Sequence, residues 1–216
     1  MKIKVFLDKV ANKIDWKIRI PLNANRYKRK LKCTDFTVIS NNCWGGRCYD
    51  YFNLPKLSPT VGAYFYAEEY VKFCKNLKYY LGCHLEVQTA DKSKYYESLK
   101  SKGEENVLIG KLDDVEIVFL HYKDEQTIVE KWNRRVGRIN WERIILKFSY
   151  QNNCTEALVK EFLEIPEYKK FCLVGKKITD NENEIVYKRS NGYETIDETY
   201  NFDKYLNVIK TINDRL

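Results

Sequence analysis

The sequence lacks the patterns by which most metal and nucleotide sites are found. It contains seven cysteines, an odd number, but no Cys-x-x-Cys pair and no His, Cys and Asp residues at the spacing of metal ligands. A structural zinc site and a disulfide framework are therefore not expected. A Gly-rich dinucleotide fingerprint and a phosphate-binding loop with its lysine are also missing. We accordingly predict no metal and no cofactor.

Long apolar segments are missing as well. No run approaches the roughly 18 apolar residues that a membrane-spanning helix needs. The first residues, Met1–Lys9, interrupt their apolar side chains with charge too early for a signal peptide. Cysteines that form no disulfides are typical of a reducing compartment. The sequence therefore predicts a cytoplasmic protein.

The net positive charge of the chain comes from its amino-terminal segment. The chain has a net charge of +8, and residues 1–35 hold eleven lysines and arginines against three aspartates, so the remainder is neutral. A domain that binds nucleic acid would carry basic residues over more of its length. Nucleic acid is therefore not an expected partner.

Apolar residues recur at helical spacing within this basic segment. They are Ile3, Leu7, Val10, Ile14 and Ile18. The spacing predicts a basic amphipathic helix over residues 3–20 that ends near Pro21. The helix either packs on its own domain or lies on an anionic membrane surface, which would make the protein peripheral at the inner membrane surface. We treat residues 1–32 as this segment and residues 33–216 as one domain.

Strand and helix patterns alternate along residues 33–216. Strands are predicted at 36–40, 84–88, 107–112, 115–120, 143–148, 171–174 and 185–187. Helices are predicted at 67–81, 93–101, 124–139, 155–163 and 201–213, and irregular backbone is predicted before Gly62 because of two prolines. The alternation predicts an α/β fold, with three α/β/α layers and a mostly parallel, mixed sheet.

The most distinctive segment follows the first predicted strand. The apolar run that begins at Phe36 stops at Ser40, and the residues that follow are Asn41, Asn42, Cys43, Trp44, Gly45 and Gly46. Loops at the carboxyl ends of strands carry binding and catalytic groups in α/β proteins. Glycines let the backbone approach a ligand closely. We therefore predict a ligand site in this segment.

Several stretches resemble a bacterial family of unknown function found in exopolysaccharide and capsule biosynthesis loci. The likeness covers roughly residues 30–175. It is carried by Ile39-Ser-Asn-Asn-Cys-Trp-Gly-Gly46, Tyr49 through Gly62 with its Leu-Pro-Lys-Leu-Ser-Pro-Thr core, Phe119-Leu-His-Tyr122, Lys131-Trp-Asn-Arg-Arg135 and Arg138-Ile-Asn-Trp141. The resemblance implies an α/β/α fold and a polysaccharide context, and it brings no established reaction.

A cysteine and a histidine are the candidate reacting groups. Cys43 follows one predicted strand and His121 follows another, so parallel strands would bring both to one edge of a sheet. His121 could then act as the base for Cys43 or a water, with Asp124 or Glu125 orienting its ring and Asn41, Asn42 and the glycine amides holding negative charge. The alternatives are a cysteine that is only a small buried hydrophobe and a histidine with a structural role.

A basic cluster is the candidate phosphate site. Its members are Asn133, Arg134, Arg135, Arg138, Asn140 and Trp141. Arg134 and Arg138 lie four residues apart, hence on one helix face, where guanidinium groups could bind phosphate while Trp141 stacks on a sugar or base. The alternative is a solvated helix face with ordinary ion pairs.

The resemblance implies a protein of exopolysaccharide or capsule biosynthesis, and the candidate site residues predict that it is an enzyme. It would be a transferase or esterase acting on a sugar-phosphate, nucleotide-sugar or acylated sugar substrate. The alternative is a non-catalytic module that binds a sugar-phosphate or docks on a membrane synthase.

Overall fold

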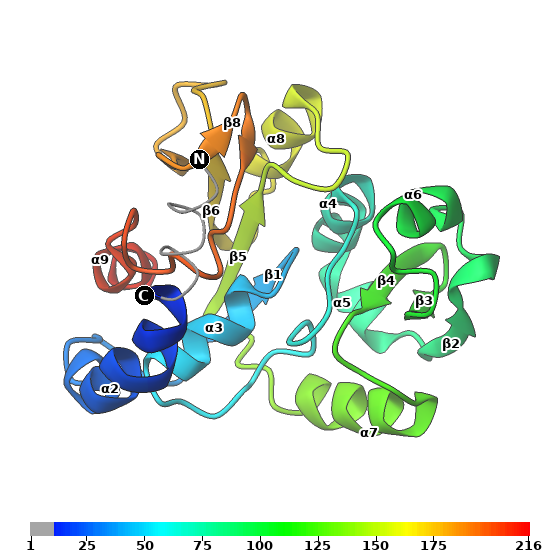
Figure 1. Cartoon of the computed structure of the whole chain (residues 1–216), viewed down its shortest axis with the longest axis horizontal. Coiled ribbons are helices and arrows are strands. Elements are labelled where there is room, and N and C mark those ends of the chain that lie inside the picture. Colours follow the sequence, from blue (N-terminus) through cyan, green and yellow to red (C-terminus); the bar gives the residue numbers. More distant parts are fainter. Residues whose placement is uncertain (1–10) are drawn as a thin grey trace.

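A four-stranded parallel sheet forms the centre of the protein in a computed structural model that describes residues 11–216 (Figure 1). Its strands, in spatial order, are β1 (Thr37–Ser40), β5 (Ile144–Ser149), β6 (Lys169–Val174) and β7 (Glu184–Val186). All three neighbouring pairs are parallel. The carboxyl ends of the strands therefore meet at one edge of the sheet.

Both faces of this sheet are covered by helices. Along β1, Val38 packs on one face and Ile39 on the other, and both are fully buried. The Val38 face is covered by α2 (Ile20–Lys28), α3 (Trp44–Tyr51) and α9 (Val208–Asn213), and the Ile39 face by α4 (Ala67–Lys75), α5 (Leu77–Gly82) and α8 (Glu156–Leu163). A parallel sheet buried on both faces, with flanking helices, confirms the predicted α/β fold class.

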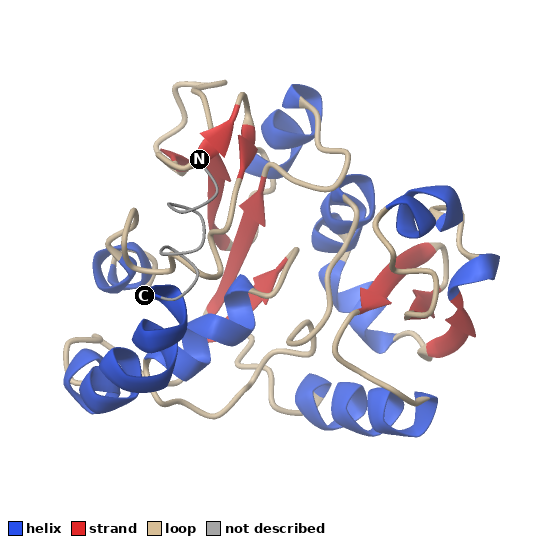
Figure 2. Cartoon of the chain, in the orientation of Figure 1, coloured by secondary structure: helices blue, strands red, loops and turns tan. Residues whose placement is uncertain are grey.

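A second sheet lies beside the first and is built by the chain between β1 and β5 (Figure 2). It contains β2 (Glu86–Thr89), β3 (Leu108–Leu112) and β4 (Val115–Phe119), all antiparallel, with η2 (Ala90–Lys92), α6 (Tyr96–Ser101) and, after β4, α7 (Glu125–Val136). The predicted hairpin is thus present, but not within the parallel sheet. The hairpin has two buried faces of its own: Ile117 packs toward α4 and α5, whereas Val118 packs with Tyr64 and Leu99.

The amino-terminal helix packs on the domain. The predicted stop near Pro21 is wrong, because the helix continues without a break from a π-helical turn, η1 (Asp15–Arg19), into α2. In this wider turn the Ile20 N–H bonds to the Asp15 carbonyl, and Pro21 follows directly after it. Ile20 and Ala24 are buried against the domain. The predicted start of this helix, residues 3–10, lies outside the described residues. Within residues 11–216, no helix is long and apolar enough to span a bilayer.

Three other predicted elements differ from the structure. The segment after Cys43 is helical as α3, the helix predicted over 67–81 breaks at Asn76, and the last helix begins only at Val208. Glycine usually weakens helices, but Gly45 and Gly46 are needed in α3. A Cβ on Gly45 would lie 3.0 Å from the Ser40 Cβ, and one on Gly46 would lie 3.2 Å from Val61. Close packing therefore outweighs local propensity. A short hairpin, β8 (Ser190–Asn191) and β9 (Glu194–Thr195), follows β7.

Candidate functional site

A hollow of about 300 Å³ opens at the carboxyl ends of β1 and β5. Polar and aromatic side chains line most of it; they include Cys43, Tyr64, Lys102, Glu104, Asn152 and Tyr200. This is the edge at which open parallel sheets bind ligands. In the part of the chain that the structure describes, no three His, Cys, Asp or Glu side chains gather as metal ligands would.

Asn41 ties the two strand ends together below the hollow. Its side-chain amide donates to the Ser149 carbonyl at 3.1 Å, and its Oδ1 accepts from the Ser149 N–H at 3.1 Å. Its own carbonyl accepts from the Phe65 N–H at 3.0 Å. The side chain is fully buried, so the predicted role of Asn41 in holding substrate charge is replaced by a structural one.

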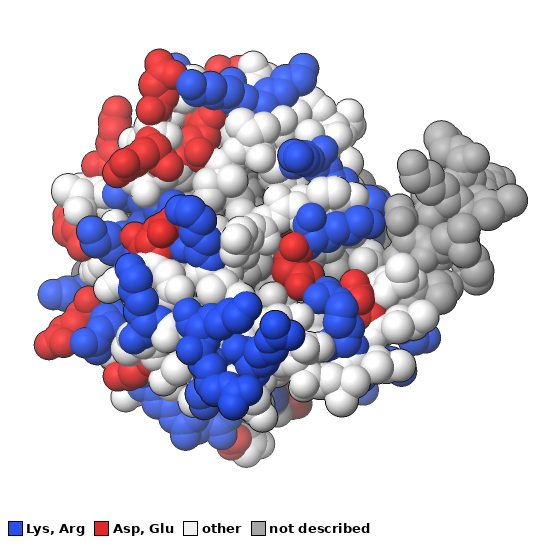
Figure 3. Space-filling view, turned by 90° about the vertical axis from the view of Figure 1, so that its left-hand side faces the viewer, with Lys and Arg blue, Asp and Glu red and all other residues white. Residues whose placement is uncertain are grey.

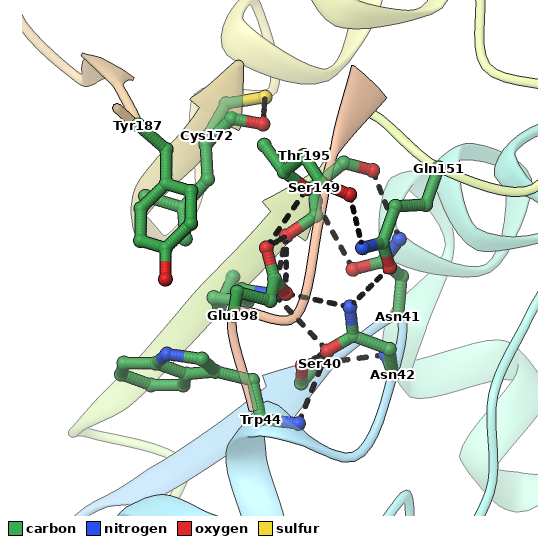
Figure 4. Close-up of polar contacts among 12 residues, drawn as sticks. Ser40, Asn41, Asn42, Trp44, Ser149, Gln151, Cys172, Tyr187, Thr195 and Glu198 are labelled. Carbon is green, nitrogen blue, oxygen red and sulfur yellow. Dashed lines mark hydrogen bonds and ion pairs between the residues drawn. The ribbon is translucent and has the colours of Figure 1, made fainter. Parts of the chain in front are cut away.

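A buried ion pair lies next to Asn42 (Figure 4). Lys147 and Glu198 form the pair, and their side chains are 0% and 1% exposed. Lys147 also donates to Asn42 Oδ1 at 3.0 Å and to the Ser149 hydroxyl. Glu198 accepts from Asn42 Nδ2 at 2.6 Å, from Ser149 at 2.7 Å and from Thr195 at 2.9 Å. All three ammonium protons and both carboxylate oxygens therefore have partners.

The environment of this pair favours the ionised carboxylate. Burial raises the pKa of Glu198, but the Lys147 ammonium and hydrogen bonds from Asn42 and Ser149 outweigh burial, so the pKa lies below its usual value. Burial lowers the pKa of Lys147, and Glu198 opposes that shift. Asn42, held by both charges, also accepts the Trp44 N–H at 3.1 Å. Its amide is thus committed to positioning the turn that carries Cys43.

Cys43 and His121 meet at the mouth of the hollow. The Cys43 Sγ lies 3.5 Å from the His121 Nε2. They meet although β1 and β4 belong to different sheets, because Tyr64 pairs with Val118 in β4 and the neighbouring Phe65 is bonded to Asn41. The backbone N–H of His121 donates to the Gly62 carbonyl at 3.4 Å.

The two groups differ in accessibility. His121 is exposed, whereas Cys43 is partly buried just before α3. Burial raises the pKa of the Cys43 thiol, although Arg47 and Lys147 act in the opposite direction. The resting thiol is therefore protonated at neutral pH, and reaction requires a base such as His121. The distance of 3.5 Å between Cys43 Sγ and His121 Nε2 is one that substrate binding can shorten to a length suited to proton transfer.

Asp124 does not orient the His121 ring. Its carboxylate accepts from the Thr127 N–H at 2.7 Å and from the Thr127 hydroxyl at 2.9 Å. Asp124 is therefore the N-cap of α7, a role that explains why this residue precedes the helix. The prediction that it assists His121 is corrected.

Trp44, Gly45 and Gly46 pack beneath the site and are not open to a ligand. Trp44 is fully buried, with its ring 5.4 Å from that of Phe171 and 4.7 Å from that of Phe202. Lys147 Nζ lies 5.6 Å from the Trp44 ring centroid. The indole is therefore part of the core below the ion pair.

The predicted phosphate cluster lies elsewhere. None of its six residues lines the hollow: Asn133, Arg134, Arg135, Arg138, Asn140 and Trp141. Arg135 is buried and donates to the Val61 carbonyl at 3.0 Å and the Tyr122 hydroxyl at 2.7 Å. Asn140 donates to Asp35. Because α7 ends at Val136, Arg134 and Arg138 do not share one helix face.

The sequence contains an unused signal for the second half of the site. The sequence prediction did not include five residues at or beside the hollow, namely Lys147, Ser149, Gln151, Asn152 and Glu198. Yet Asn-Asn-Cys occurs after β1 (residues 41–43) and again after β5 (residues 152–154). Two neighbouring parallel strands that are each followed by this tripeptide indicate two loops at one site.

Gly62 supports the loop that places His121. We expect Gly62→Ala to lower the free energy of unfolding by about 1–3 kcal/mol, because its φ is +84° and a Cβ would lie 2.8 Å from the Tyr122 ring. Urea unfolding would measure this loss. The matched control is Gly103→Ala, whose φ is +70° with no atom within 4 Å of the added Cβ. An equal loss in both variants would show that contact with Tyr122 contributes nothing.

Comparison with known proteins gives a family but no activity. Residues 15–214 match a domain of unknown function, DUF1919. The chain is also similar to an uncharacterized protein of Haemophilus influenzae, with 28% identity over 158 residues, which is 73% of this chain and 70% of that protein. Since the match to the domain covers nearly the whole sequence, this chain belongs to the DUF1919 family.

Proposed function

We propose that this protein is a thiol-dependent acyl-transfer enzyme, a transferase or an esterase, acting on an acylated sugar. The observation that carries this proposal is the approach of Cys43 Sγ to His121 Nε2 at the mouth of a polar hollow. A cysteine next to an imidazole base is a recurrent arrangement for attack on esters. The hollow lies where parallel sheets present such groups.

The geometry suggests the following chemical steps. The Cys43 sulfur attacks the ester carbonyl carbon while His121 Nε2 accepts the thiol proton. The tetrahedral intermediate collapses, the C–O bond breaks, and His121 returns the proton to the leaving alcohol, which leaves a thioester on Cys43. A water or a sugar hydroxyl then attacks the thioester carbonyl carbon while His121 accepts its proton. The C–S bond breaks, His121 returns the proton to the Cys43 sulfur, and a carboxylic acid or a newly acylated sugar leaves. Helix α3 begins at Trp44, the residue after Cys43, and its amino-terminal dipole favours the negative charge that develops on the carbonyl oxygen of the substrate.

A carbohydrate fits the chemistry of the hollow. The side-chain oxygens of Gln151 and Asn152 already accept from Asn42 and Lys102, and each can accept one further hydrogen bond from a hydroxyl group. The exposed Tyr200 offers an aromatic face. Lys102 is the cation that a substrate phosphate would meet, because the arginine cluster lies elsewhere. Assignment to surface-polysaccharide assembly rests on the sequence resemblance described above, and a cytoplasmic location rests on the free cysteines.

The second candidate is a module that binds a sugar-phosphate without catalysis. The raised pKa of the Cys43 thiol favours it, because a protonated thiol is a weak nucleophile. In that case Cys43→Ser would leave ligand binding intact, as measured by thermal shift with a nucleotide-sugar panel. The unaltered protein would form no acyl-enzyme.

Selective alkylation tests the enzymatic proposal. We expect iodoacetamide to label Cys43 at least about tenfold faster than Cys154, and His121→Gln to remove most of that difference. Cys154 is the matched control, since it also follows Asn-Asn at a strand end and is partly buried, and its pKa is raised to about 12 by burial. Peptide mass mapping measures both rates in one sample.

Two results would contradict the proposal. Equal labelling of Cys43 and Cys154 would show that the Cys43 thiol is not activated. Fast labelling of Cys43 that persists in His121→Gln would show that the histidine is not its base.

A further inference from the structure

Three large apolar side chains of the amino-terminal helix face solvent. Ile14, Ile18 and Leu22 are 51%, 54% and 79% exposed, and Leu22 is the most exposed large apolar residue in the range 11–216. Steps of four residues in an α-helix drift by about 40°. The wider π-helical turn η1, which begins directly after Ile14 and contains Ile18, counteracts that drift. The three side chains therefore form one stripe along the helix.

The opposite side of this helix is fixed to the domain. Arg19 donates two hydrogen bonds of 2.8 Å to Asp203, and the Trp16 indole donates to the Tyr200 carbonyl at 3.2 Å. Ile20 and Ala24 are buried. The stripe therefore stays directed outward without any rearrangement.

Cations border the stripe. Lys13 and Lys17 each precede a stripe residue and are exposed, and Arg26, Arg29 and Lys30 are exposed farther along. Asp15 is the single acidic residue of residues 11–34, and it pairs with Arg19 at 2.7 Å. Figure 3 shows lysine and arginine side chains gathered over the lower part of the face that carries α2 and α9. The exposed surface of the helix is thus both apolar and positive.

We infer that this helix face docks on the surface of an anionic lipid bilayer. A bilayer supplies both an apolar layer for Ile14, Ile18 and Leu22 and negative head groups for the lysines. A nucleic acid would match the charge but would leave the apolar side chains in water. A second copy of the chain could cover the apolar stripe but would bring two basic surfaces together. The bilayer therefore satisfies both features at once.

Vesicle sedimentation of the full chain tests this inference. We expect strong partition to mixed phosphatidylglycerol–phosphatidylcholine vesicles, weak partition to phosphatidylcholine alone, and a decrease with salt. Ile18→Gln/Leu22→Gln should lower the partition coefficient at least about tenfold. Lys13→Gln/Lys17→Gln should lower it about fivefold for each lysine removed. The matched control is Tyr79→Gln, a 57% exposed aromatic outside this helix, which should leave partition unchanged.

Several outcomes would overturn the inference. These are no partition to the anionic vesicles, equal partition to both vesicle types, or partition that neither helix variant changes. Light scattering provides a separate readout: a dimer that Leu22→Gln dissociates, without vesicle binding, would assign the stripe to a second copy. All substituted residues are exposed, and thermal unfolding would verify that the variants retain their fold.

Discussion

Replacement of Lys147 by methionine is expected to lower the free energy of unfolding by about 3–5 kcal/mol. The variant would leave the Glu198 carboxylate buried without its ammonium partner, since the side chains of Lys147 and Glu198 are 0% and 1% exposed. It would also remove the donor that holds Asn42 Oδ1. Urea unfolding at neutral pH, followed by circular dichroism, would measure the loss. A loss below about 1 kcal/mol would contradict the view that this pair organises the site.

Two further variants separate the charge effect from a packing effect. Lys147→Met/Glu198→Leu removes both charges and should recover much of the lost stability, because a buried pair replaced by apolar groups is often nearly neutral. Lys169→Met alters an exposed lysine at the start of β6 and should change stability by less than about 0.5 kcal/mol. If the double variant were as unstable as Lys147→Met, the loss would come from packing.

The sequence predicted the parts of this fold that follow local rules. β1 is predicted correctly because its residues are buried on both faces of the sheet, and the largely apolar, β-branched run that begins at Phe36 stops abruptly at Ser40. The start of α8 is marked by Thr155, whose hydroxyl accepts from the Leu158 N–H. Each of these features depends on neighbours within a few residues, so periodicity and capping reveal it.

The parts that were missed depend on contacts distant in sequence. Glu198 lies 156 residues from Asn42 and 51 from Lys147, in a segment without periodicity. Buried charges also contradict the general expectation that Lys and Glu are exposed, so no local pattern marks them. Cys43 and His121 meet because the segment containing Tyr64 pairs with Val118 in β4 and, through Phe65, bonds to Asn41 at the end of β1. The prediction that the two residues lie together assumed parallel strands of one sheet, and that reason is incorrect.

His121→Gln is expected to lower the rate of p-nitrophenyl acetate hydrolysis by about 10²–10⁴-fold if the proposed function holds. The substitution keeps a polar side chain of similar reach at an exposed position, so the free energy of unfolding should change little. Steady-state kinetics, with mass spectrometry to detect an acetyl group on Cys43, would measure the effect. Loss of the acetyl-enzyme together with the rate would assign the proton transfer to the first, thiol-attack step.

Asp124→Ala is the control that separates the two roles considered for this carboxylate. The Asp124 carboxylate accepts from the Thr127 N–H and hydroxyl at the start of α7, so its removal should cost about 1 kcal/mol of stability, the usual value of an N-cap. The hydrolysis rate should stay within about twofold of the original protein, since no step of the proposed chemistry uses this group. A rate loss in Asp124→Ala as large as that in His121→Gln would instead show that the carboxylate reaches the imidazole during the reaction. The cap would then be a resting arrangement, and a Cys-His-carboxylate site would have to assemble only when substrate binds.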